Sequence, residues 1–527
     1  MYRRTQNVPN VNIRQKISPV SSGGVNEDEL EQILDPRNCL ICDNWDIKAK
    51  SILSAVKGHV ETFEVAGETD KITMLKEFFD DMWIYAVGKK VQKYVPSTDT
   101  HTLIHTFTTT NKFDGAKAGD YFMICNGDTR IGVINAAGTT FTENSDTNTP
   151  KANVLWLHAG RLFSNSTADD GVYWSDVYQG SGAPYQDYTP AATPPLVAES
   201  WYTFKEGAGQ CTGFGSLDND VIFVLFEKGR AKFKLDVTTN DTDTRQIIIT
   251  AFEAFNSSGG SRALTTTKGV VYATFEGIFL APLGQPLLKE DINISVNMGR
   301  ARLEKFNFSD ADFVEFEETL WVTLRDNADN NNLIAKYTWK FGAWSYRKSI
   351  KISNFMPIGN KLYGASSVES IVYQLESGYS DLGENVRSEY LQPFNTPYDW
   401  TRIETLIKIF LQGKLSPASY IEVSIDRILE TGAVQEKVKT YTWGTTGLSS
   451  GGVGIGDAGI GIGGIGGSSS GTGDPVLSRA DKSPYIKNAA GLRLRIVRTD
   501  KVESEIHSFK FATEYNRDQK LSNLTEV

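Results

Sequence analysis

The sequence contains few of the residues that most often build metal, redox and acid–base sites. Its 527 residues include 4 cysteines, 5 histidines and 6 methionines. Cys39 and Cys42 form a C-x-x-C pair, but no second pair and no flanked histidine pair completes a zinc set. A redox C-x-x-C opens a helix after a strand, and Pro36-Arg37-Asn38 does not indicate one. We therefore predict buried or incidental thiols, which suits synthesis in a reducing compartment.

Long apolar runs are also missing. No window approaches the 18 consecutive apolar residues of a transmembrane helix, and the first residues lead into no apolar signal segment. We expect neither stable membrane insertion nor secretion by a Sec-type signal.

Positive charge is in deficit. Lys and Arg number 54 against 64 Asp and Glu, a formal net charge of −10, and no Lys/Arg block occurs. Proteins that grip DNA neutralise its phosphates with a basic face. Tight or sequence-specific DNA binding is therefore not expected, although an acidic protein could let DNA pass without holding it.

Familiar catalytic signatures are absent from the sequence, including G-x-S-x-G, the P-loop, H-E-x-x-H and a strand-linked G-x-G-x-x-G. Acidic pairs such as Asp169/Asp170, or Glu315 with Glu317, could flank a glycosidic bond, but such pairs are commoner in solvated turns. The Asn/Asp-rich segment 326–332 lacks the Gly and the terminal Glu of an EF-hand loop. The sequence thus predicts no catalytic residue, no cofactor and no metal site, and a protein that is not an enzyme.

Short β-rich runs ended by Gly, Asn or Asp turns are what the sequence has in abundance. Seven of these runs carry an aromatic anchor, at steps of 39, 34, 67, 49, 49 and 42 residues. This spacing is typical of four-stranded propeller blades with one long insertion, while stacked β-sandwiches are the alternative. The anchors are Trp83, Phe122, Trp156, Phe223, Tyr272, Trp321 and Tyr363.

The period stops after Gly378, and long alternating strands such as Arg402–Leu411 follow. The predicted fold class is therefore all-β, with a β-propeller of six to eight blades over residues 49–380. A polar N-terminal arm covers residues 1–48, and a C-terminal β-sandwich domain covers residues 381–527. A helix is expected over Thr69–Phe79.

A Gly-rich insertion, residues 444–473, interrupts the predicted sandwich. Its part from Gly451 to Gly473 holds 12 of the 47 glycines and alternates them with Ile, Val or Ala. One interpretation is a flexible surface loop. The other is a loop that orders against a neighbouring subunit or lines a pore, because exposed isoleucine is unfavourable in water. The candidate channel, gate or subunit-contact residues are Gly454, Ile455, Gly456, Ile460, Ile462 and Ile465.

One local motif resembles the Asp-box of sialidases and related propellers. Thr167, Asp169, Gly171 and Trp174 match its pattern [ST]-x-D-x-G-x-x-[WF]. In those families the box shapes a turn and has no catalytic role. A sialidase would show several boxes and an arginine triad, whereas a single box is found here, so the match favours a propeller and hardly favours an enzyme.

The third β-rich unit carries a more extended pattern. It reads His158-Ala159-Gly160-Arg161-Leu162-Phe163, continues with Val172-Tyr173-Trp174-Ser175-Asp176, and is followed by Gln186-Asp187-Tyr188. This resembles the H-x-x-R-L-[FV]…V-[YW]-x-S unit of the tail nozzle and packaged-DNA-stabilisation proteins of short-tailed bacteriophages. The strands around Thr405–Leu411 and Ile506–Glu514 are similar to the appended β-domain of that family, so the resemblance spans about residues 30–515.

The resemblance implies a structural virion protein of the phage tail, synthesised in the host cytoplasm. In that family six copies form a ring, a homo-hexamer, below the portal and adaptor, which retains packaged DNA and opens for DNA ejection. Expected partners are further copies of the chain, the portal–adaptor and other tail proteins, double-stranded DNA in transit without specific binding, and the host envelope. The Gly-rich insertion does not map onto the family's pattern.

Two other functions remain open from the sequence. One is a glycan-binding or glycan-cleaving propeller, such as a receptor-binding tail protein. The other is a soluble propeller that serves as a scaffold for protein partners.

Overall fold

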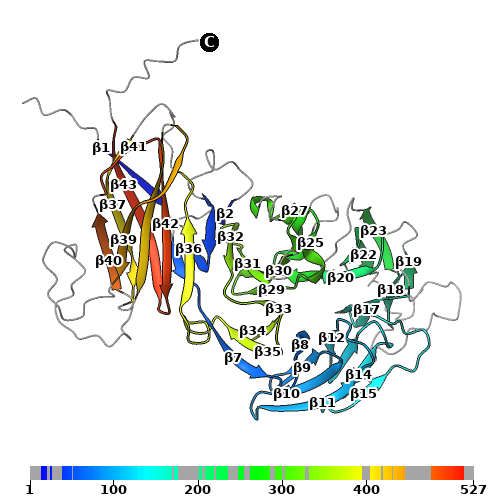
Figure 1. Cartoon of the computed structure of the whole chain (residues 1–527). Coiled ribbons are helices and arrows are strands. Elements are labelled where there is room, and N and C mark those ends of the chain that lie inside the picture. Colours follow the sequence, from blue (N-terminus) through cyan, green and yellow to red (C-terminus); the bar gives the residue numbers. More distant parts are fainter. Residues whose placement is uncertain are drawn as a thin grey trace, which may run out of the picture. The chain divides into compact units, whose positions relative to one another are not determined.

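The chain folds into two compact units (Figure 1). The propeller unit comprises His59–Lys336 and Ile350–Glu376, and the sandwich unit comprises Met1–Gly58, Tyr337–Ser349 and Ser377–Val527. The computed structural model describes residues 13–19, 24–26, 38–49, 52–168, 171–175, 201–203, 208–218, 221–235, 247–254, 262–284, 291–298, 303–326, 332–394, 404–416, 419–429, 431–444, 476–482 and 484–515.

The propeller unit consists of antiparallel sheets whose strands follow one another in the chain. The first blade contains β8 (Ile72–Phe79), β9 (Met82–Val87), β10 (Lys90–Val95) and β11 (Thr100–Thr106). The second contains β12 (Asp114–Ala118), β13 (Tyr121–Cys125), β14 (Gly132–Ile134) and β15 (Phe141–Glu143). The third contains β16 (Leu155–His158), β17 (Arg161–Asn165), β18 (Gly171–Trp174) and β19 (Trp201–Thr203).

Four further blades continue this order. The fourth contains β20 (Cys211–Ser216), β21 (Val221–Phe226), β22 (Gly229–Leu235) and β23 (Ile247–Ala254), and the fifth contains β24 (Leu264–Thr266), β25 (Gly269–Thr274), β26 (Gly277–Pro282) and β27 (Ile292–Asn293). In the sixth, β30 (Thr319–Asp326) pairs with β29 (Phe313–Phe316), with β28 (Phe306–Asn307) and with β31 (Asn332–Thr338). The seventh contains β33 (Ile352–Ile358), β34 (Lys361–Ser366), β35 (Ile371–Leu375) and β7 (His59–Glu64). Two short 3₁₀ turns are present: η2 (Val296–Met298) follows the fifth blade, and η3 (Phe308–Asp310) lies between β28 and β29 of the sixth.

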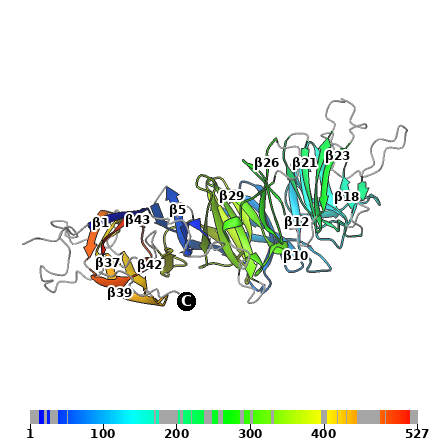
Figure 2. The same ribbon diagram turned by 90° about the horizontal axis from the view of Figure 1, so that it is seen from above.

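The ring of blades is closed by strands from opposite ends of the unit. β7, the first strand of the unit, pairs antiparallel with β35, the last, with Leu375 opposite His59. The first strands of successive blades contact one another, and β33 contacts β8. Figure 2 shows the blades of this unit from above. In the described residues the propeller therefore has seven blades, which confirms the predicted fold class.

The aromatic anchors follow the blades closely. Six of the seven lie on the second strand of their blade, whereas Trp156 lies on the first strand of the third blade. This displacement shortens the step before Trp156 and lengthens the step after it, which also contains the long segment between β18 and β19. Second strands such as Val221–Phe226 are buried along nearly their whole length, because neighbouring blades cover both of their faces. Burial of each large apolar side chain contributes about 1.5–3 kcal/mol.

The predicted helix over Thr69–Phe79 is wrong, because most of this segment is the strand β8. Ile72 pairs with Val87 and Phe79 pairs with Met82 of β9. The register shifts at two bulges within this pairing, so the apolar residues lose the two-residue alternation of a regular strand. The apolar spacing that results imitates a helix, and pairing across the hairpin decides the structure.

The sandwich unit contains two sheets of long strands. One has the order β40 (Val476–Lys482), β37 (Glu404–Leu415), β43 (Ser504–Tyr515), β6 (Ile52–Ala55) and β5 (Trp45–Ala49), with β1 (Ile13–Pro19) beside β43 and β41 (Ile486–Ala489) beside β37. The other has the order β32 (Ala343–Arg347), β4 (Ile41–Asp43), β36 (Val386–Leu391), β42 (Gly491–Asp500), β38 (Tyr420–Ile428) and β39 (Val434–Gly444). A short parallel pair, β2 (Gly24–Val25) and β3 (Asn38–Cys39), accompanies them.

The two sheets pack face to face. A Cβ placed on Gly413 of β37 would lie 2.9 Å from Cη2 of Trp443, which belongs to β39 of the other sheet. Trp443 is buried, as are Leu492, Leu494 and Ile496 of β42. This alternation of buried apolar residues is the pattern that indicates a strand with one face on a core.

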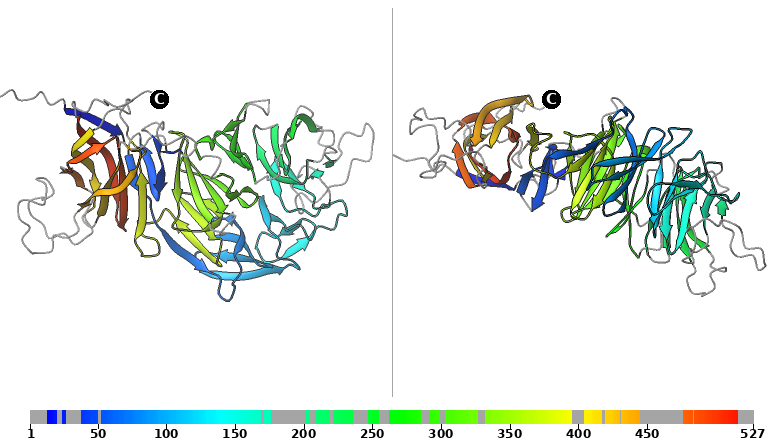
Figure 3. Two further views of the ribbon diagram at one scale, coloured as in Figure 1. Left: turned by 45° about the horizontal axis from the view of Figure 1, so that its top comes forward. Right: turned by 90° about the horizontal axis from the view of Figure 1, so that it is seen from below.

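The division of the chain differs from the predicted one in two places. The predicted N-terminal arm supplies sandwich strands, since β1 pairs with β43 from Ile13–Glu514 to Pro19–Ser508 (Figure 3). Residues 337–349, predicted within the propeller, supply β32, in which Tyr346 lies opposite Asp43 of β4. Both pairings join segments hundreds of residues apart, which a local pattern cannot reveal.

The four thiols are free and buried, as predicted. Burial raises the pKa of Cys125 and Cys211, and a hydrogen bond with Cys39 together with burial raises that of Cys42. Because the thiolate is the reactive form, we expect Ellman's reagent at pH 8 to label the folded protein very slowly and to label four thiols in denaturant. A Ser97→Cys variant, on an exposed turn, supplies the positive control. Rapid labelling of two native thiols would contradict this prediction and indicate a reactive C-x-x-C.

Candidate functional site

Several residues proposed from the sequence lie outside the described part of the chain. These are Gly454, Ile455, Gly456, Ile460, Ile462, Ile465, Asp169, Asp176, Gln186, Asp187 and Tyr188. Their predicted roles stay predictions. No helix among the described residues is long and apolar enough to cross a membrane.

The nozzle-like motif, by which we mean His158–Phe163 and Val172–Ser175 of the third blade, is held together by hydrogen bonds. Arg161 begins β17 and is 4% exposed, and its Nη1 donates to the carbonyl oxygen of Ser175 at 2.8 Å. The Ser175 hydroxyl accepts from the Leu162 amide at 3.0 Å, and the Ser175 amide donates to the Leu162 carbonyl at 3.0 Å. The buried arginine and serine of the motif therefore hold the end of β18 against the start of β17.

His158, the first residue of the motif, links the third blade to the fourth. Its Nδ1 lies 2.7 Å from the Ser216 hydroxyl of β20, which also accepts from Trp156 Nε1 at 3.2 Å. The Ser216 hydroxyl can then donate to Nδ1 while it accepts from the indole. The arrangement fixes the Trp156 ring and joins two blades.

The described members of the Asp-box-like motif also make structural contacts. The Thr167 hydroxyl donates to the carbonyl oxygens of Gly127 and Lys151, each at 3.1 Å. Trp174 is 6% exposed, and its ring centroid lies 6.4 Å from that of Phe163. Thr167 therefore ties the third blade to the second, while Trp174 belongs to the core between the third and fourth blades.

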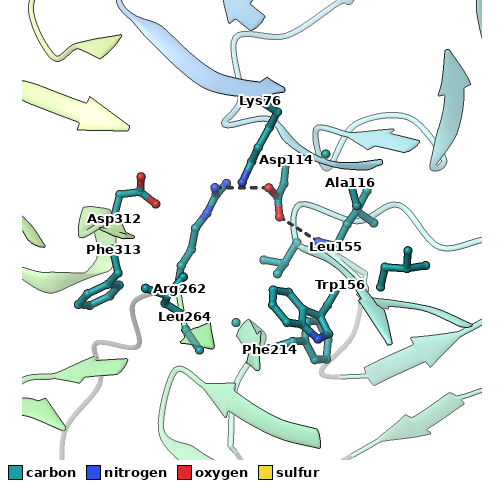
Figure 4. A pocket seen from close by; sticks show the side chains of 15 residues that line it. Lys76, Asp114, Ala116, Leu155, Trp156, Phe214, Arg262, Leu264, Asp312 and Phe313 are labelled. Carbon is teal, nitrogen blue, oxygen red and sulfur yellow. Dashed lines mark hydrogen bonds and ion pairs between the residues drawn. The ribbon is translucent and has the colours of Figure 1, made fainter. Parts of the chain in front are cut away.

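A cavity of about 250 Å³ lies where first strands of the propeller meet (Figure 4). Six blades contribute to its lining, and the wall combines apolar and aromatic side chains with charged groups. The charged residues are Lys76, Asp114, Arg262 and Asp312, and the larger apolar residues are Leu155, Trp156, Phe214, Leu264 and Phe313. We refer to it as the axial cavity.

The charged groups of the axial cavity connect blades to one another. Arg262 Nη1 lies 3.4 Å from Asp114 Oδ1, and Arg262 Nη2 donates to the Phe113 carbonyl at 3.0 Å. Asp114 Oδ2 accepts from the Leu155 amide at 3.0 Å. Figure 4 shows that Lys76 also points toward Arg262 and Asp114. The fifth, second and third blades are thus joined by one buried ion pair and its backbone contacts.

Asp312 plays a corresponding role in the sixth blade. Its Oδ2 accepts from the Phe355 amide of the seventh blade at 2.8 Å, while its own amide donates to the Thr323 hydroxyl at 2.8 Å. Asp114 begins the first strand of its blade, and Asp312 directly precedes the first strand of its own. The first strands of the other five blades neither begin with an aspartate nor directly follow one, so no repeat pattern in the sequence singles out Asp114 and Asp312.

The axial cavity was not found by motif search, because no motif contains its charged residues. Its lining combines a carboxylate, a guanidinium and aromatic rings, a mixture of groups that is common in small-molecule pockets. Among the described residues, no group of three or more His, Cys, Asp or Glu side chains could hold a metal ion.

Comparison with known proteins yields similarity only among solved structures. No family model matches the sequence. No curated protein matches it either. Similar solved structures include the WD40 β-propeller domain of Doa1, at 10% identity and a TM-score of 0.42, covering 60% of this chain and 96% of that one. Another is U3-55K, at 9% identity and a TM-score of 0.40, covering 60% and 99%. A third is the computationally designed Ika8 protein, at 10% identity and a TM-score of 0.38, covering 67% and 98%. The assignment of the blades rests on the strand order of this chain itself.

Proposed function

We propose that this protein is a structural subunit of the tail nozzle of a short-tailed bacteriophage, acting without enzymatic activity in a homo-oligomeric ring. The observation that carries the proposal is the placement of the nozzle-like motif. His158, Arg161 and Ser175 are the residues that hold the third blade together and join it to the fourth. A resemblance at positions on which the architecture depends is what distant members of one structural family would retain.

The second part of the resemblance concerns the sandwich. The strands similar to the family's appended β-domain fall on β37 and β43, which pair along their whole length from Glu404–Tyr515 to Leu415–Ser504. They form the middle of their sheet, with β40 and β41 on one side and β6 and β1 on the other. The similarity again lies in residues that define the fold of the unit.

The closed propeller and the negative net charge of the chain are both compatible with a ring through which DNA passes. The propeller is closed by β7 and β35, so its blades cannot open without loss of that pairing. The formal net charge of −10 disfavours capture of the DNA backbone, so a ring of such chains would let DNA slide through. In this proposal the ring sits below the portal and adaptor in the virion, retains packaged DNA and meets the host envelope at ejection.

Native mass spectrometry and particle imaging of the purified full chain test the proposal. Six copies of the 58.3 kDa chain would have a mass of about 350 kDa, and we expect a ring of that mass, alone or on addition of portal–adaptor complexes. The ring should not retain double-stranded DNA at physiological salt. A chain that stays monomeric at micromolar concentration with portal–adaptor present would contradict the proposal.

A second candidate is supported by the axial cavity. Trp156, Phe214 and Phe313 lie in its wall with the Asp114–Arg262 pair, and aromatic faces beside paired polar groups suit the recognition of a sugar ring. This would make the chain a glycan-binding or glycan-cleaving receptor-binding propeller. Calorimetry against a panel of bacterial surface glycans distinguishes the two: millimolar or tighter binding, lost in Trp156→Ala, by a monomeric chain would favour the second candidate.

A further inference from the structure

A second cavity of the propeller unit, about 340 Å³ in volume, has a different character from the axial cavity. It is lined by segments of the first, second, sixth and seventh blades, close to where the ring closes. Three cationic side chains, Lys71, Lys112 and Arg325, line it with a single carboxylate, Asp310. Most of its remaining lining is hydroxyl, amide and backbone. We refer to it as the cationic cavity.

The local charge opposes that of the whole chain. Three positive groups against one negative group leave an excess of two positive charges, in a protein whose formal net charge is −10. Arg325 Nη1 lies 2.8 Å from Asp310 Oδ2, so this pair neutralises itself at a partly exposed position. Lys71 and Lys112 account for the excess.

Lys112 is held where a cation is disfavoured. Burial, and then the charge of Arg262, lower its pKa to about 8, although Asp310, Asp312 and Asp114 oppose this shift. The ammonium group is thus still largely protonated at neutral pH. A partly buried ammonium that is also repelled by the charge of Arg262 is stabilised by an anion that contacts it.

Two hydroxyl groups of the cationic cavity also lack a protein partner. Thr73 Oγ1 and Ser367 Oγ are shielded from solvent, and neither makes a hydrogen bond within the protein. Two other polar side chains of the lining already have partners within the protein, because Ser353 Oγ and Asn354 Nδ2 each donate to the Ile72 carbonyl at 3.2 Å. Buried hydroxyl groups usually find a partner. These two hydroxyl groups thus have no acceptor within the protein, and their residues belong to the lining of the cavity.

From this combination we propose that the cationic cavity binds a small tetrahedral oxyanion: phosphate, either free or as the terminal group of a phosphomonoester. Lys71 and Lys112 would supply charge, and Thr73 and Ser367 would donate hydrogen bonds to its oxygens. Charge-assisted contacts of this kind are the strong ones in anion recognition. Arg325 lies at the same cavity but is paired with Asp310, so it adds no net charge.

Isothermal titration calorimetry of the full chain tests the site, with inorganic phosphate in one arm and adenosine 5′-monophosphate in the other. We expect binding of one anion per chain, weakened about tenfold or more in Lys112→Met and in Thr73→Val. Lys361→Met, which removes an exposed lysine of β34 in the same unit, should leave the affinity unchanged. Tighter binding of the nucleotide than of phosphate would identify the phosphomonoester as the source.

The dependence on pH gives a readout that a purely structural role would not produce. Sulfate, whose charge is constant above pH 4, should bind more weakly as the pH rises through about 8, because Lys112 then loses its proton. Lys112→Arg should bind sulfate with a flatter profile. Circular dichroism melts confirm that each variant is folded. Absence of binding to the folded wild type at about 10 mM phosphate, which corresponds to a dissociation constant above the millimolar range, or an unchanged affinity in Lys112→Met, would overturn the proposal.

Discussion

Replacement of Asp291 by alanine is expected to lower the free energy of unfolding of the propeller unit by about 3–5 kcal/mol. Asp291 Oδ2 lies 2.9 Å from Arg230 Nη1 and accepts from the Tyr272 hydroxyl at 2.7 Å. The side chains of Arg230 and Asp291 are 9% and 1% exposed. Arg230 belongs to the fourth blade, and the other two residues belong to the fifth. Loss of the carboxylate removes a charged partner of a guanidinium that is buried between two blades.

Urea denaturation followed by tryptophan fluorescence measures this effect. Lys90→Ala is the control, because the Lys90–Glu68 pair has a lysine that is 43% exposed, and pairs of that kind contribute about 1 kcal/mol or less. The loss of unfolding free energy in Asp291→Asn should lie between the losses in Asp291→Ala and Lys90→Ala, because the amide oxygen still accepts from Tyr272 but the side chain carries no charge. A loss below about 1 kcal/mol in Asp291→Ala would show that the ion pair is not a link between blades.

The second large effect is expected in the sandwich unit, where Gly413→Val should destabilise the fold by about 3 kcal/mol or more. A Cβ at this position would lie 2.2 Å from the Glu505 carbonyl oxygen of the neighbouring strand and 2.9 Å from Trp443 of the facing sheet. The first of these atoms belongs to the backbone, so no side-chain rotation relieves the overlap. β37 and β43 would have to separate at their bulge.

Lys414→Val provides a matched control for Gly413→Val. It places the same side chain one residue further along β37, on the exposed face of the sheet, where surface substitutions usually change stability by about 0.5 kcal/mol or less. Soluble yield, the thermal midpoint and limited proteolysis of the two variants give the comparison. Equal stability of both variants would mean that the sheets do not pack as closely at Gly413 as described.

Prediction from the sequence succeeded where the information is local and repeated. The anchors recur once per blade because each second strand is covered on both faces and must be apolar and aromatic. It failed at β8, where two bulges in the pairing with β9 change the apolar spacing. It also missed Asp114, Arg262 and Lys112, because single charged residues at strand starts and in loops carry no motif.

The two cavities depend on the closure of the ring. Lys71 and Ser367 are separated by almost the whole propeller sequence, yet the closed ring places both in the lining of one cavity. The same holds for Arg262 and Phe113, which are joined by a hydrogen bond although 149 positions separate them. Such proximity is a property of the closed ring and of no segment within it.

Two features of the sequence were sufficient by themselves. The small number of cysteines, with no second metal-ligand pair, predicted buried thiols, and the recurring aromatic strand predicted a propeller. Local composition is sufficient there, because burial and strand formation depend on neighbours within a few residues. The tertiary structure alone decided that the N-terminal strand belongs to the sandwich, that the blades number seven among the described residues, and that charged groups meet inside the ring. These features arise from backbone pairing between distant segments, whose free energy depends on partners that no local window of the sequence contains.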